Sequence, residues 1–404
     1  MKKTLLLLLG IAAATLSAAG FKSGARAVAY KIDKANNSVT VISATAYDPK
    51  KPEGECVHTL VWDKGTVFAK VSVPALSTIT PGRVGICFLA AAEAAKAAKG
   101  QTFSCGRVEF EPEYKGKIGF IGKQKLAIPV FPPRKGRFAE TEIDGKKVKF
   151  NPGRIMVFTN GTVDDIRVGE NQLRIWGKEQ NGKFVINRVE INPAPKFDRD
   201  PKLPDVLVAG DSISMNYEKA LIAALKGKMN CRRIEGNSGD SNRGNEALKL
   251  WLGELPGQKS RWSVVVLNHG LHDLKQKSDP KTKVFDPKHQ VEPDVYAKNI
   301  DRLLNYLTSN NYKVVWCTTT PVPGSSYGAY SRRKDEDLVY NKVLEPVLKK
   351  YPQVTVCDLN KVVRSSSVYD EWRKGTNVHF KEGPERELLG KAVAEAVLKA
   401  AGKK

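Results

Sequence analysis

The fold of the second half of this 404-residue chain is decided by one short stretch, DVLVAGDSIS, at residues 205–214. Residues 206–209 are apolar and a helical pattern follows from Tyr217, so the stretch predicts a strand, a tight turn and a helix in direct succession. Gly210 permits the tight backbone of the turn. Ser212 then falls on the strand-to-helix turn, close to the unpaired N–H groups and the positive dipole end of the helix, which stabilise developing negative charge. A serine at this place is either a nucleophile or a helix cap.

The same alternation of strand and helix continues to the end of the chain. Apolar, strand-like runs lie at residues 205–209, 231–235, 263–268, 313–319 and 354–358, and amphipathic stretches of helical length lie at 217–225, 244–252, 294–309, 337–350 and 384–400. Such strands, joined by helices, predict a five-stranded parallel sheet covered on both faces, which is a three-layer αβα sandwich. In such a sheet the chemistry lies beyond the carboxyl ends of the strands.

The first half of the chain has a different period. Short runs of alternating apolar residues recur between residues 27 and 191, and turn signals such as Asn160-Gly161 and Asn181-Gly182 separate them. This pattern is typical of antiparallel hairpins, and it predicts a β-sandwich over residues 20–195 with one short helix at 90–98. The proline-rich segment at 192–204 indicates a linker to the α/β domain, residues 203–404.

The N-terminus has the features of a secretory signal. Lys2 and Lys3 precede an apolar run at residues 5–16, and the small residues Ser17 and Ala19 are spaced for cleavage. We therefore expect a signal peptide at residues 1–19 and a protein that is secreted or periplasmic. No later run reaches the roughly 18 apolar residues of a membrane-spanning helix, so we expect no membrane span in the mature protein.

Composition argues against several kinds of site. The formal net charge of +23 is spread over the chain, without the basic stripe and interleaved aromatic residues of a nucleic-acid-binding surface, so we expect no nucleic-acid partner. None of the six cysteines has metal-ligand spacing. Cys317 and Cys357 stand in apolar, β-branched runs, where a cysteine acts as a small buried hydrophobe. We expect neither a cofactor nor a metal.

A serine nucleophile needs a base, and the chain offers five histidines. His379 follows the fifth predicted strand and precedes the last helix, so its loop should lie over the same edge of the sheet as Ser212. His58 falls in the β half, and His289 falls in a polar loop. His379 is therefore the predicted base.

Four short blocks of the second half resemble, in the same order, those of the GDSL/SGNH hydrolase superfamily. GDSIS at 210–214 is similar to the block with the nucleophilic serine, SGDS at 238–241 to the block whose glycine lines the oxyanion hole, GLHD at 270–273 to the Gly-x-Asn-Asp block, and VHF at 378–380 to the histidine block. The string NHGLHDL at 268–274 also resembles a subgroup of exported bacterial members found with carbohydrate-active enzymes. The resemblance implies an SGNH-like fold and an oxyanion hole that includes Gly239.

One departure from the family pattern concerns the oxyanion hole. His272 stands where the family has an asparagine, and either a neutral His272 imidazole or the Asn268 amide has an N–H to offer. His269, His272 and Asp273 are also potential metal ligands. Alternate residues leaving a strand point to opposite faces, which disfavours a metal site. Another interpretation is that His272 and Asp273 form a buried hydrogen-bonded pair.

A second departure concerns the group that orients the histidine. Thr376 stands where the family has an aspartate three residues before its histidine, and a threonine offers no carboxylate. His379 would then be oriented by a backbone carbonyl, by Asn377, or by an acid from elsewhere such as Asp370.

These observations predict an exported serine esterase. His379 would deprotonate Ser212, which attacks an ester carbonyl, and the N–H groups of Ser212 and Gly239 would hold the oxyanion together with His272 or Asn268. The resemblance implies an O-acyl ester, by analogy O-acetyl, on a polysaccharide as substrate. Two rival interpretations are a non-catalytic glycan-binding protein with the same fold and an O-acyltransferase.

Overall fold

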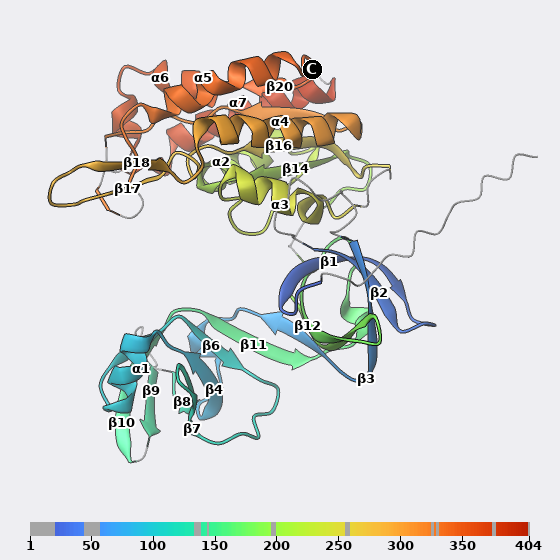
Figure 1. Ribbon diagram of the computed structural model, residues 1–404, viewed down its shortest axis with the longest axis vertical. Coiled ribbons are helices and arrows are strands. Elements are labelled where there is room, and N and C mark those ends of the chain that lie inside the picture. The colour runs from blue at the N-terminus through green and yellow to red at the C-terminus, as the bar shows by residue number, and fades with distance from the viewer. Residues whose placement is uncertain are drawn as a thin grey trace, which may run out of the picture. The chain divides into compact units, whose positions relative to one another are not determined.

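The computed structural model describes residues 21–43, 57–132, 139–143, 145–194, 199–254, 259–324, 327–328, 331–373 and 377–402. The chain divides into two compact units, one of residues 1–41 and 58–194 and the other of residues 42–57 and 195–404 (Figure 1). The division at residue 195 falls within the segment expected to be a linker. The expected signal peptide at residues 1–19 lies outside the described residues. No helix of the described part is long and apolar enough to cross a lipid bilayer.

The C-terminal unit is built on a five-stranded sheet in the order β15-β14-β16-β19-β20. Its strands are β14 (Asp205–Gly210), β15 (Asn230–Arg233), β16 (Trp262–Asn268), β19 (Lys313–Cys317) and β20 (Thr355–Cys357). Every pairing is parallel, which confirms the predicted sheet. β14 and β16 are interior strands because their runs are apolar on both faces, and residues 206–209 and 264–267 are at most 2% exposed.

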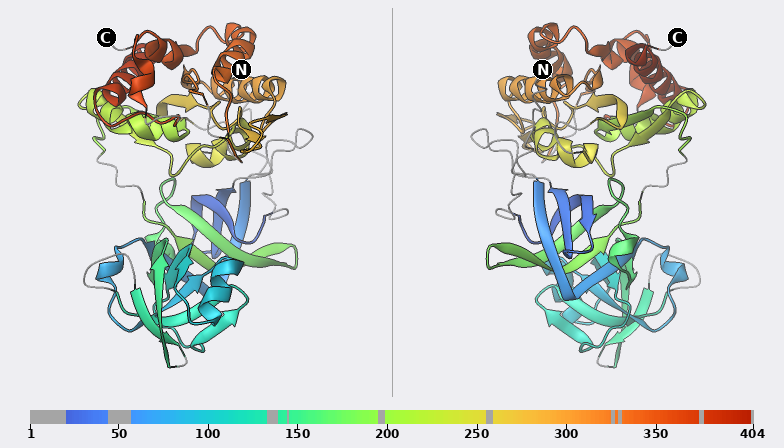
Figure 2. Two further views of the ribbon diagram at one scale, coloured as in Figure 1. Left: turned by 90° about the vertical axis from the view of Figure 1, so that its left-hand side faces the viewer. Right: turned by 90° about the vertical axis from the view of Figure 1, so that its right-hand side faces the viewer.

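Helices cover both faces of this sheet, as predicted. On one face, α2 (Ser212–Leu225) packs against α7 (Pro384–Ala401), which also contacts α6 (Leu359–Arg364). On the other face, α3 (Ser241–Leu252), α4 (Pro293–Ser309) and α5 (Glu336–Lys349) pack in succession. In the left view of Figure 2, α2 and α7 (yellow-green and red) lie on one side of the strands and α4 and α5 (orange) on the other. The unit is therefore a three-layer αβα sandwich.

Two helices begin earlier than the apolar period predicted. α2 begins at Ser212 instead of Tyr217, and α3 begins at Ser241. Each follows an aspartate, Asp211 or Asp240, whose side chain accepts an N–H of the first turn. A capping side chain, not the apolar pattern, sets where these helices start.

Some short elements of the C-terminal unit were not predicted. β17 (Gln276–Ser278) and β18 (Phe285–His289) form an antiparallel hairpin, and η4 (Tyr369–Trp372) is a short 3-10 helix. Their sequences are too short, and those of the hairpin too polar, to show a strand or helix period.

Five strands of the N-terminal unit close into a barrel. They are β1 (Ala25–Asp33), β2 (Ser38–Ser43), β3 (Val57–Ser72), β12 (Gln172–Gln180) and β13 (Lys183–Ile191), in the order β13-β12-β1-β2-β3. β13 pairs with β12 in antiparallel fashion and with β3 in parallel, and this second pairing joins the two ends of the row. Val41, Leu60, Leu173 and Ile175 are fully buried in the core that the barrel encloses.

The same sheet continues from β3 through β11 (Ile155–Asn160), β6 (Arg107–Phe110), β4 (Arg83–Phe88), β8 (Lys125–Val130) and β7 (Gly119–Gly122). A second sheet consists of β5 (Phe103–Cys105), β10 (Lys146–Pro152) and β9 (Ala139–Ile143). The predicted short helix is α1 (Ala91–Ala98), and two 3-10 helices are η2 (Leu76–Thr78) and η3 (Val163–Asp165).

The expected antiparallel β-sandwich is thus not what the strand order shows. The ring of strands is closed, and β13–β3, β11–β6 and β10–β5 are parallel pairs. Alternating apolar residues correctly indicated that this unit is built of strands, but a sandwich and a barrel both bury one face of each strand. The alternation alone therefore did not distinguish these architectures.

Candidate active site

Ser212 is the first residue of α2, directly beyond the end of β14. Asp211 caps this helix, since its Oδ1 accepts the Ile213 N–H at 2.9 Å. Ser214 is fully buried and donates its hydroxyl to the Asp211 carbonyl at 2.7 Å. The Ser212 hydroxyl is half-buried, takes no part in the capping and makes no hydrogen bond to any described residue. It is therefore free to react.

The backbone before Ser212 requires a glycine. Gly210 pairs in register with Asn268 at the end of β16. A Cβ atom at Gly210 would lie 2.6 Å from Ser214 Cβ and 3.1 Å from Asn268 Cβ. Both contacts are shorter than van der Waals distance, so only glycine lets the ends of β14 and β16 approach this closely. The same approach places Asn268 beside the turn that carries Ser212.

His379 lies in the loop before α7, and Asn377 holds its imidazole. Asn377 Oδ1 accepts the backbone N–H of His379 at 3.0 Å and lies 2.6 Å from the ring Nδ1. Because a backbone N–H only donates, the oxygen of the Asn377 amide faces His379. Nδ1 therefore carries the proton, and Nε2 keeps the lone pair that a general base needs. Thr376 and the side chain of Asp370 lie outside the described part of the structure.

Three hydrogen bonds fix the backbone on both sides of this histidine. Arg373 Nη1 donates to Val378 O at 2.8 Å, and Arg386 Nη2 donates to Phe380 O at 2.9 Å. The Phe380 N–H in turn donates to Asn216 Oδ1 at 3.0 Å. The loop is thus held by two guanidinium groups and by a side chain of α2.

Asn216 links the His379 loop to the first turn of α2. Residues four apart lie on the same face of a helix, so Ser212 and Asn216 face the same side, one turn apart. The structure therefore brings Ser212 and His379 to the same edge of the sheet. No hydrogen bond joins the Ser212 hydroxyl to the His379 ring. Such bonds are often long in a free enzyme and tighten when substrate binds.

Gly239 is less available as an oxyanion donor than expected. It has a φ of +69°, a left-handed conformation that glycine adopts without strain. Its N–H, however, donates to Asn237 Oδ1 at 2.8 Å. This N–H would reach an oxyanion only if the Asn237 side chain moved away.

His272 has an assigned tautomer. Lys275 Nζ lies 2.9 Å from His272 Nδ1, and an ammonium only donates, so Nδ1 accepts and Nε2 carries the proton. Burial and the positive charge of Lys275 lower the pKa of His272 to about 4. The ring is therefore neutral at ordinary pH and offers one N–H, at Nε2. This N–H is a hydrogen-bond donor of the kind expected of His272.

Asn268 is the other candidate donor. It is 2% exposed, and its side chain makes no hydrogen bond to any described residue. The Asn268 amide is therefore available to bind a group that lies beside the Ser212 turn. Asn268 and His272 are thus both available where Gly239 is not.

His269 and Asp273 serve the framework of the site. His269 is fully buried and its Nδ1 lies 3.3 Å from Gly239 O, while Asp273 Oδ1 accepts the Ser241 N–H at 2.8 Å. Neither residue forms a hydrogen bond with His272, so the alternative of a hydrogen-bonded His272–Asp273 pair is not seen. Among the described residues no group of three or more His, Cys, Asp and Glu side chains is arranged to hold a metal ion.

Sequence reasoning missed Arg332, a half-buried residue between β19 and α5. Its Nε donates to Leu271 O at 2.7 Å. Burial is the main cause that lowers the pKa of His379, and the positive charge of Arg332 is the next. Burial also raises the pKa of Asp211 to about 6, and Arg332 opposes this rise. A guanidinium that acts on both residues lies close to the site, and no motif in its surroundings indicated it.

Many of the solved structures that are similar to this chain are SGNH or GDSL hydrolases. An acetyl xylan esterase, AlAXEase, has 16% identity over 48% of this chain and 98% of its own, with a TM-score of 0.35. A GDSL-like lipase from Bacteroides thetaiotaomicron has 15% identity over 50% of this chain and 91% of its own, with a TM-score of 0.35. The C-terminal catalytic domain of peptidoglycan O-acetyltransferase A from Streptococcus pneumoniae has 18% identity over 50% of this chain and 96% of its own, with a TM-score of 0.33. No family model and no curated protein matches the chain.

Proposed function

We propose that the C-terminal unit is a serine hydrolase that cleaves acyl esters, with Ser212 as nucleophile and His379 as general base. The observation that carries this proposal is the contact between Asn377 Oδ1 and His379 Nδ1 at 2.6 Å. It leaves Nε2 as the acceptor of a proton, in a loop that is bound to α2 one turn beyond Ser212. A serine at a helix N-terminus and a histidine with a free Nε2 are the two parts that acyl transfer requires.

The reaction proceeds through an acyl-enzyme. His379 Nε2 takes the hydroxyl proton as Ser212 Oγ attacks the ester carbonyl carbon, and the carbonyl electron pair moves onto the oxygen. The donors to this oxyanion are the N–H of Ser212, the Asn268 amide and His272 Nε2–H. The tetrahedral intermediate then expels the alcohol, which receives the proton from His379. Water then attacks the acyl-enzyme while His379 Nε2 takes its proton. The second tetrahedral intermediate expels Ser212 Oγ, which receives the proton from His379, and the acid is released.

For the substrate, we propose an O-acyl ester, and specifically an O-acetyl ester, carried by a polysaccharide outside the cell. Two sequence features support this part of the proposal. One is the resemblance of residues 268–274 to exported members found with carbohydrate-active enzymes, and the other is the signal-like N-terminus. A hydroxyl acceptor in place of water would make the same acyl-enzyme an acyltransferase intermediate.

A covalent probe tests the nucleophile directly. A fluorophosphonate should label the wild-type chain at Ser212, located by peptide mass spectrometry, and Ser212→Ala should abolish both labelling and hydrolysis of an aryl acetate. Ser214→Ala is the matched control, because that hydroxyl is buried and bound to Asp211 O. The Ser214→Ala variant should still be labelled at Ser212. Label on Ser214, or equal turnover in wild type and Ser212→Ala, would remove Ser212 as nucleophile.

The fate of the acyl group separates the candidate activities. With an acetylated xylo-oligosaccharide, a hydrolase releases acetate in step with loss of the ester, and a transferase moves acetyl to an added unacetylated acceptor. Mass spectrometry of the sugars and assay of free acetate measure both. No turnover of either kind across a panel of esters would favour a glycan-binding protein with this fold.

A further inference from the structure

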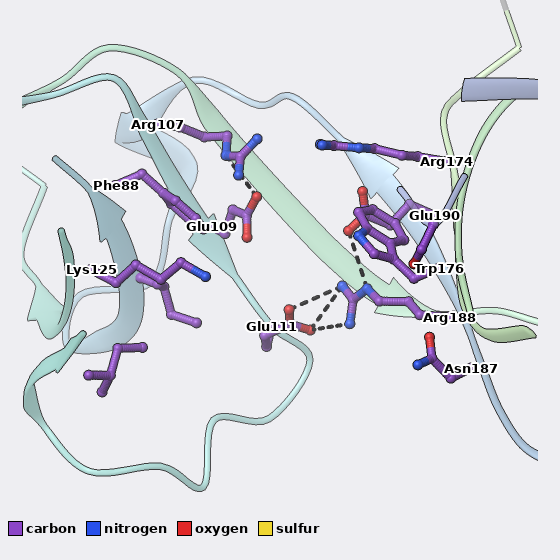
Figure 3. A pocket seen from close by; sticks show the side chains of 13 residues that line it. Phe88, Arg107, Glu109, Glu111, Lys125, Arg174, Trp176, Asn187, Arg188 and Glu190 are labelled. Carbon is purple, nitrogen blue, oxygen red and sulfur yellow. Dashed lines mark hydrogen bonds and ion pairs between the residues drawn. The ribbon is translucent and has the colours of Figure 1, made fainter. Parts of the chain in front are cut away.

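The N-terminal unit contains a pocket of about 580 Å³ that none of the roles above uses. Its lining residues come from β4, β6, β7 and β8 of the sheet's extension and from β12 and β13 of the barrel. Figure 3 shows Phe88, Arg107 and Lys125 facing Arg174, Trp176 and Arg188 across it. The pocket therefore lies between two parts of one continuous sheet.

The strand period explains how the pocket acquires its lining. On β12, Arg174 and Trp176 line the pocket, while Leu173 and Ile175 are fully buried on the opposite face. The same alternation holds along β4 and β6. Each strand thus gives one face to the core and the other to the pocket.

Aromatic rings support the cations of the pocket. The guanidinium carbon of Arg174 lies 4.9 Å from the ring centre of Trp176. Lys125 Nζ lies 5.0 Å from the ring centre of Phe88, and the Arg107 guanidinium carbon lies 4.2 Å from it. These distances are those of cation–π contacts, which fix the positive groups over the rings.

The carboxylates of the pocket are held in place by arginines. Arg107 Nε lies 2.8 Å from Glu109, and Arg188 bridges Glu111 at 3.1 Å and Glu190 at 3.2 Å. Burial raises the pKa of both Glu109 and Glu190. These groups therefore give the pocket fixed hydrogen-bond acceptors.

Two cations of the pocket form no salt bridge with a described residue, although Lys125 acts electrostatically on Glu109 and Arg174 on Glu190. Within the described residues, Lys125 and Arg174 form no ion pair, and Arg174 Nε donates only to the carbonyl of Gly24, at 3.2 Å. The lining has four cations, Arg107, Lys125, Arg174 and Arg188, against three glutamates. The pocket thus combines spare positive charge with acceptors and apolar rings, and a ligand should carry acidic groups, hydroxyls and apolar C–H surface together.

We propose that this pocket binds an acidic oligosaccharide. Lys125 and Arg174 bind the sugar carboxylates, the glutamates accept sugar hydroxyls, and Phe88 and Trp176 contact the C–H faces of the rings. Uronic acid residues have all three features. A nucleic-acid strand fits less well, because three glutamates would face its phosphates. The site belongs to the N-terminal unit alone, so it goes beyond the proposed esterase activity and does not depend on it.

The test is titration calorimetry on the full chain with Ser212→Ala, so that hydrolysis plays no part. The probe is tetragalacturonate, and neutral cellotetraose and a thymidine tetranucleotide are compared with it in low salt. We expect tetragalacturonate to bind at least about tenfold tighter than either, and added NaCl to weaken it. Lys125→Met and Arg174→Met should each reduce its affinity by at least about tenfold. Lys178→Met is the matched control, because Lys178 is an exposed residue on the same strand as Arg174 but outside the pocket. This substitution should leave the affinity for tetragalacturonate unchanged.

Three results would overturn the proposal. The first is no binding of tetragalacturonate, and the second is equal or tighter binding of cellotetraose or the tetranucleotide. The third is a loss of tetragalacturonate affinity in Lys178→Met as large as in Arg174→Met, which would indicate a diffuse electrostatic attraction to the positive protein surface. Circular dichroism checks the folding of each variant. If Arg174→Met fails to fold, Lys125→Met carries the test, since its ammonium makes no hydrogen bond to a described residue.

Discussion

Asn377 Oδ1 contacts the imidazole of His379 at the candidate active site. An asparagine orients a catalytic histidine correctly only if its oxygen, and not its nitrogen, faces Nδ1. Here the backbone N–H of His379 imposes that orientation, because it donates to the same Oδ1 at 3.0 Å. A neutral residue thus selects the tautomer that a serine hydrolase needs, although it adds no negative charge to stabilise the imidazolium.

Substitution of Asn377 should separate orientation from charge. Asn377→Ala should lower kcat/KM for an aryl acetate by roughly 100-fold or more, since the ring is then free to rotate and change tautomer. Asn377→Asp keeps the acceptor and adds a negative charge, which raises the pKa of His379. It should retain activity above neutral pH and lose it at a higher pH than wild type on acidification. Full activity in Asn377→Ala would show that another group orients His379.

The pH dependence of catalysis should report the positive surroundings of His379. A general base acts when neutral, and burial, followed by the charge of Arg332, lowers the pKa of His379. We expect kcat/KM to fall on acidification with an apparent pKa below about 6.5, the ordinary value for histidine. Arg332→Met removes a positive charge, so the pKa should rise and the fall should begin at a higher pH.

Arg333→Met is the matched control, because the neighbouring guanidinium is exposed and lies 5.4 Å from the ring centre of Phe285. This substitution should leave the fall of kcat/KM at acid pH unchanged. If kcat/KM falls at the same acid pH in wild type, Arg332→Met and Arg333→Met, the charge of Arg332 does not act on His379.

Among the elements, the parallel strands were the most predictable. An interior strand such as β16 is apolar on both faces, and a run like WSVVVLN has few other ways to be buried. The starts of α2 and α3 were less predictable, because the capping aspartates Asp211 and Asp240 precede the apolar pattern. Closure of the N-terminal barrel depends on the β13–β3 pairing between distant segments, which no local pattern encodes.

The places of the candidate site residues in the fold were predictable to the same degree as the elements that carry them. Ser212 and His379 were located because each follows a predicted strand at one edge of the sheet. The pairing of Gly239 N–H with Asn237 and the approach of Arg332 were not, since both depend on how loops fold over that edge. Spacing along the chain identifies which residues reach the edge, and only the folded loops decide which of their atoms are free.

At the scale of the whole molecule, a buried acid should make stability depend on pH. Asp273 is fully buried, its Oδ1 accepts the Ser241 N–H, and its Oδ2 has no partner among the described residues. Burial raises the pKa of Asp273 to about 7, against about 3.9 for an unfolded chain. A folded-state pKa above the unfolded one means that the contribution to stability is full below about pH 3.9 and is lost as pH rises through 7.

Asp273→Asn tests this linkage, because the amide keeps the oxygen that accepts the Ser241 N–H and cannot ionise. The free energy of unfolding, from urea titrations followed by tryptophan fluorescence at pH 5 to 8, should fall with rising pH more steeply in wild type than in the variant. The shift of about three pKa units corresponds to about 4 kcal/mol in full, of which about 3 kcal/mol is lost between pH 5 and 8. Other groups that titrate in this window, such as Asp211, act in both proteins and cancel in the difference. Parallel curves for the two proteins would show that Asp273 keeps one protonation state throughout, and that its carboxyl group is not the source of any pH dependence.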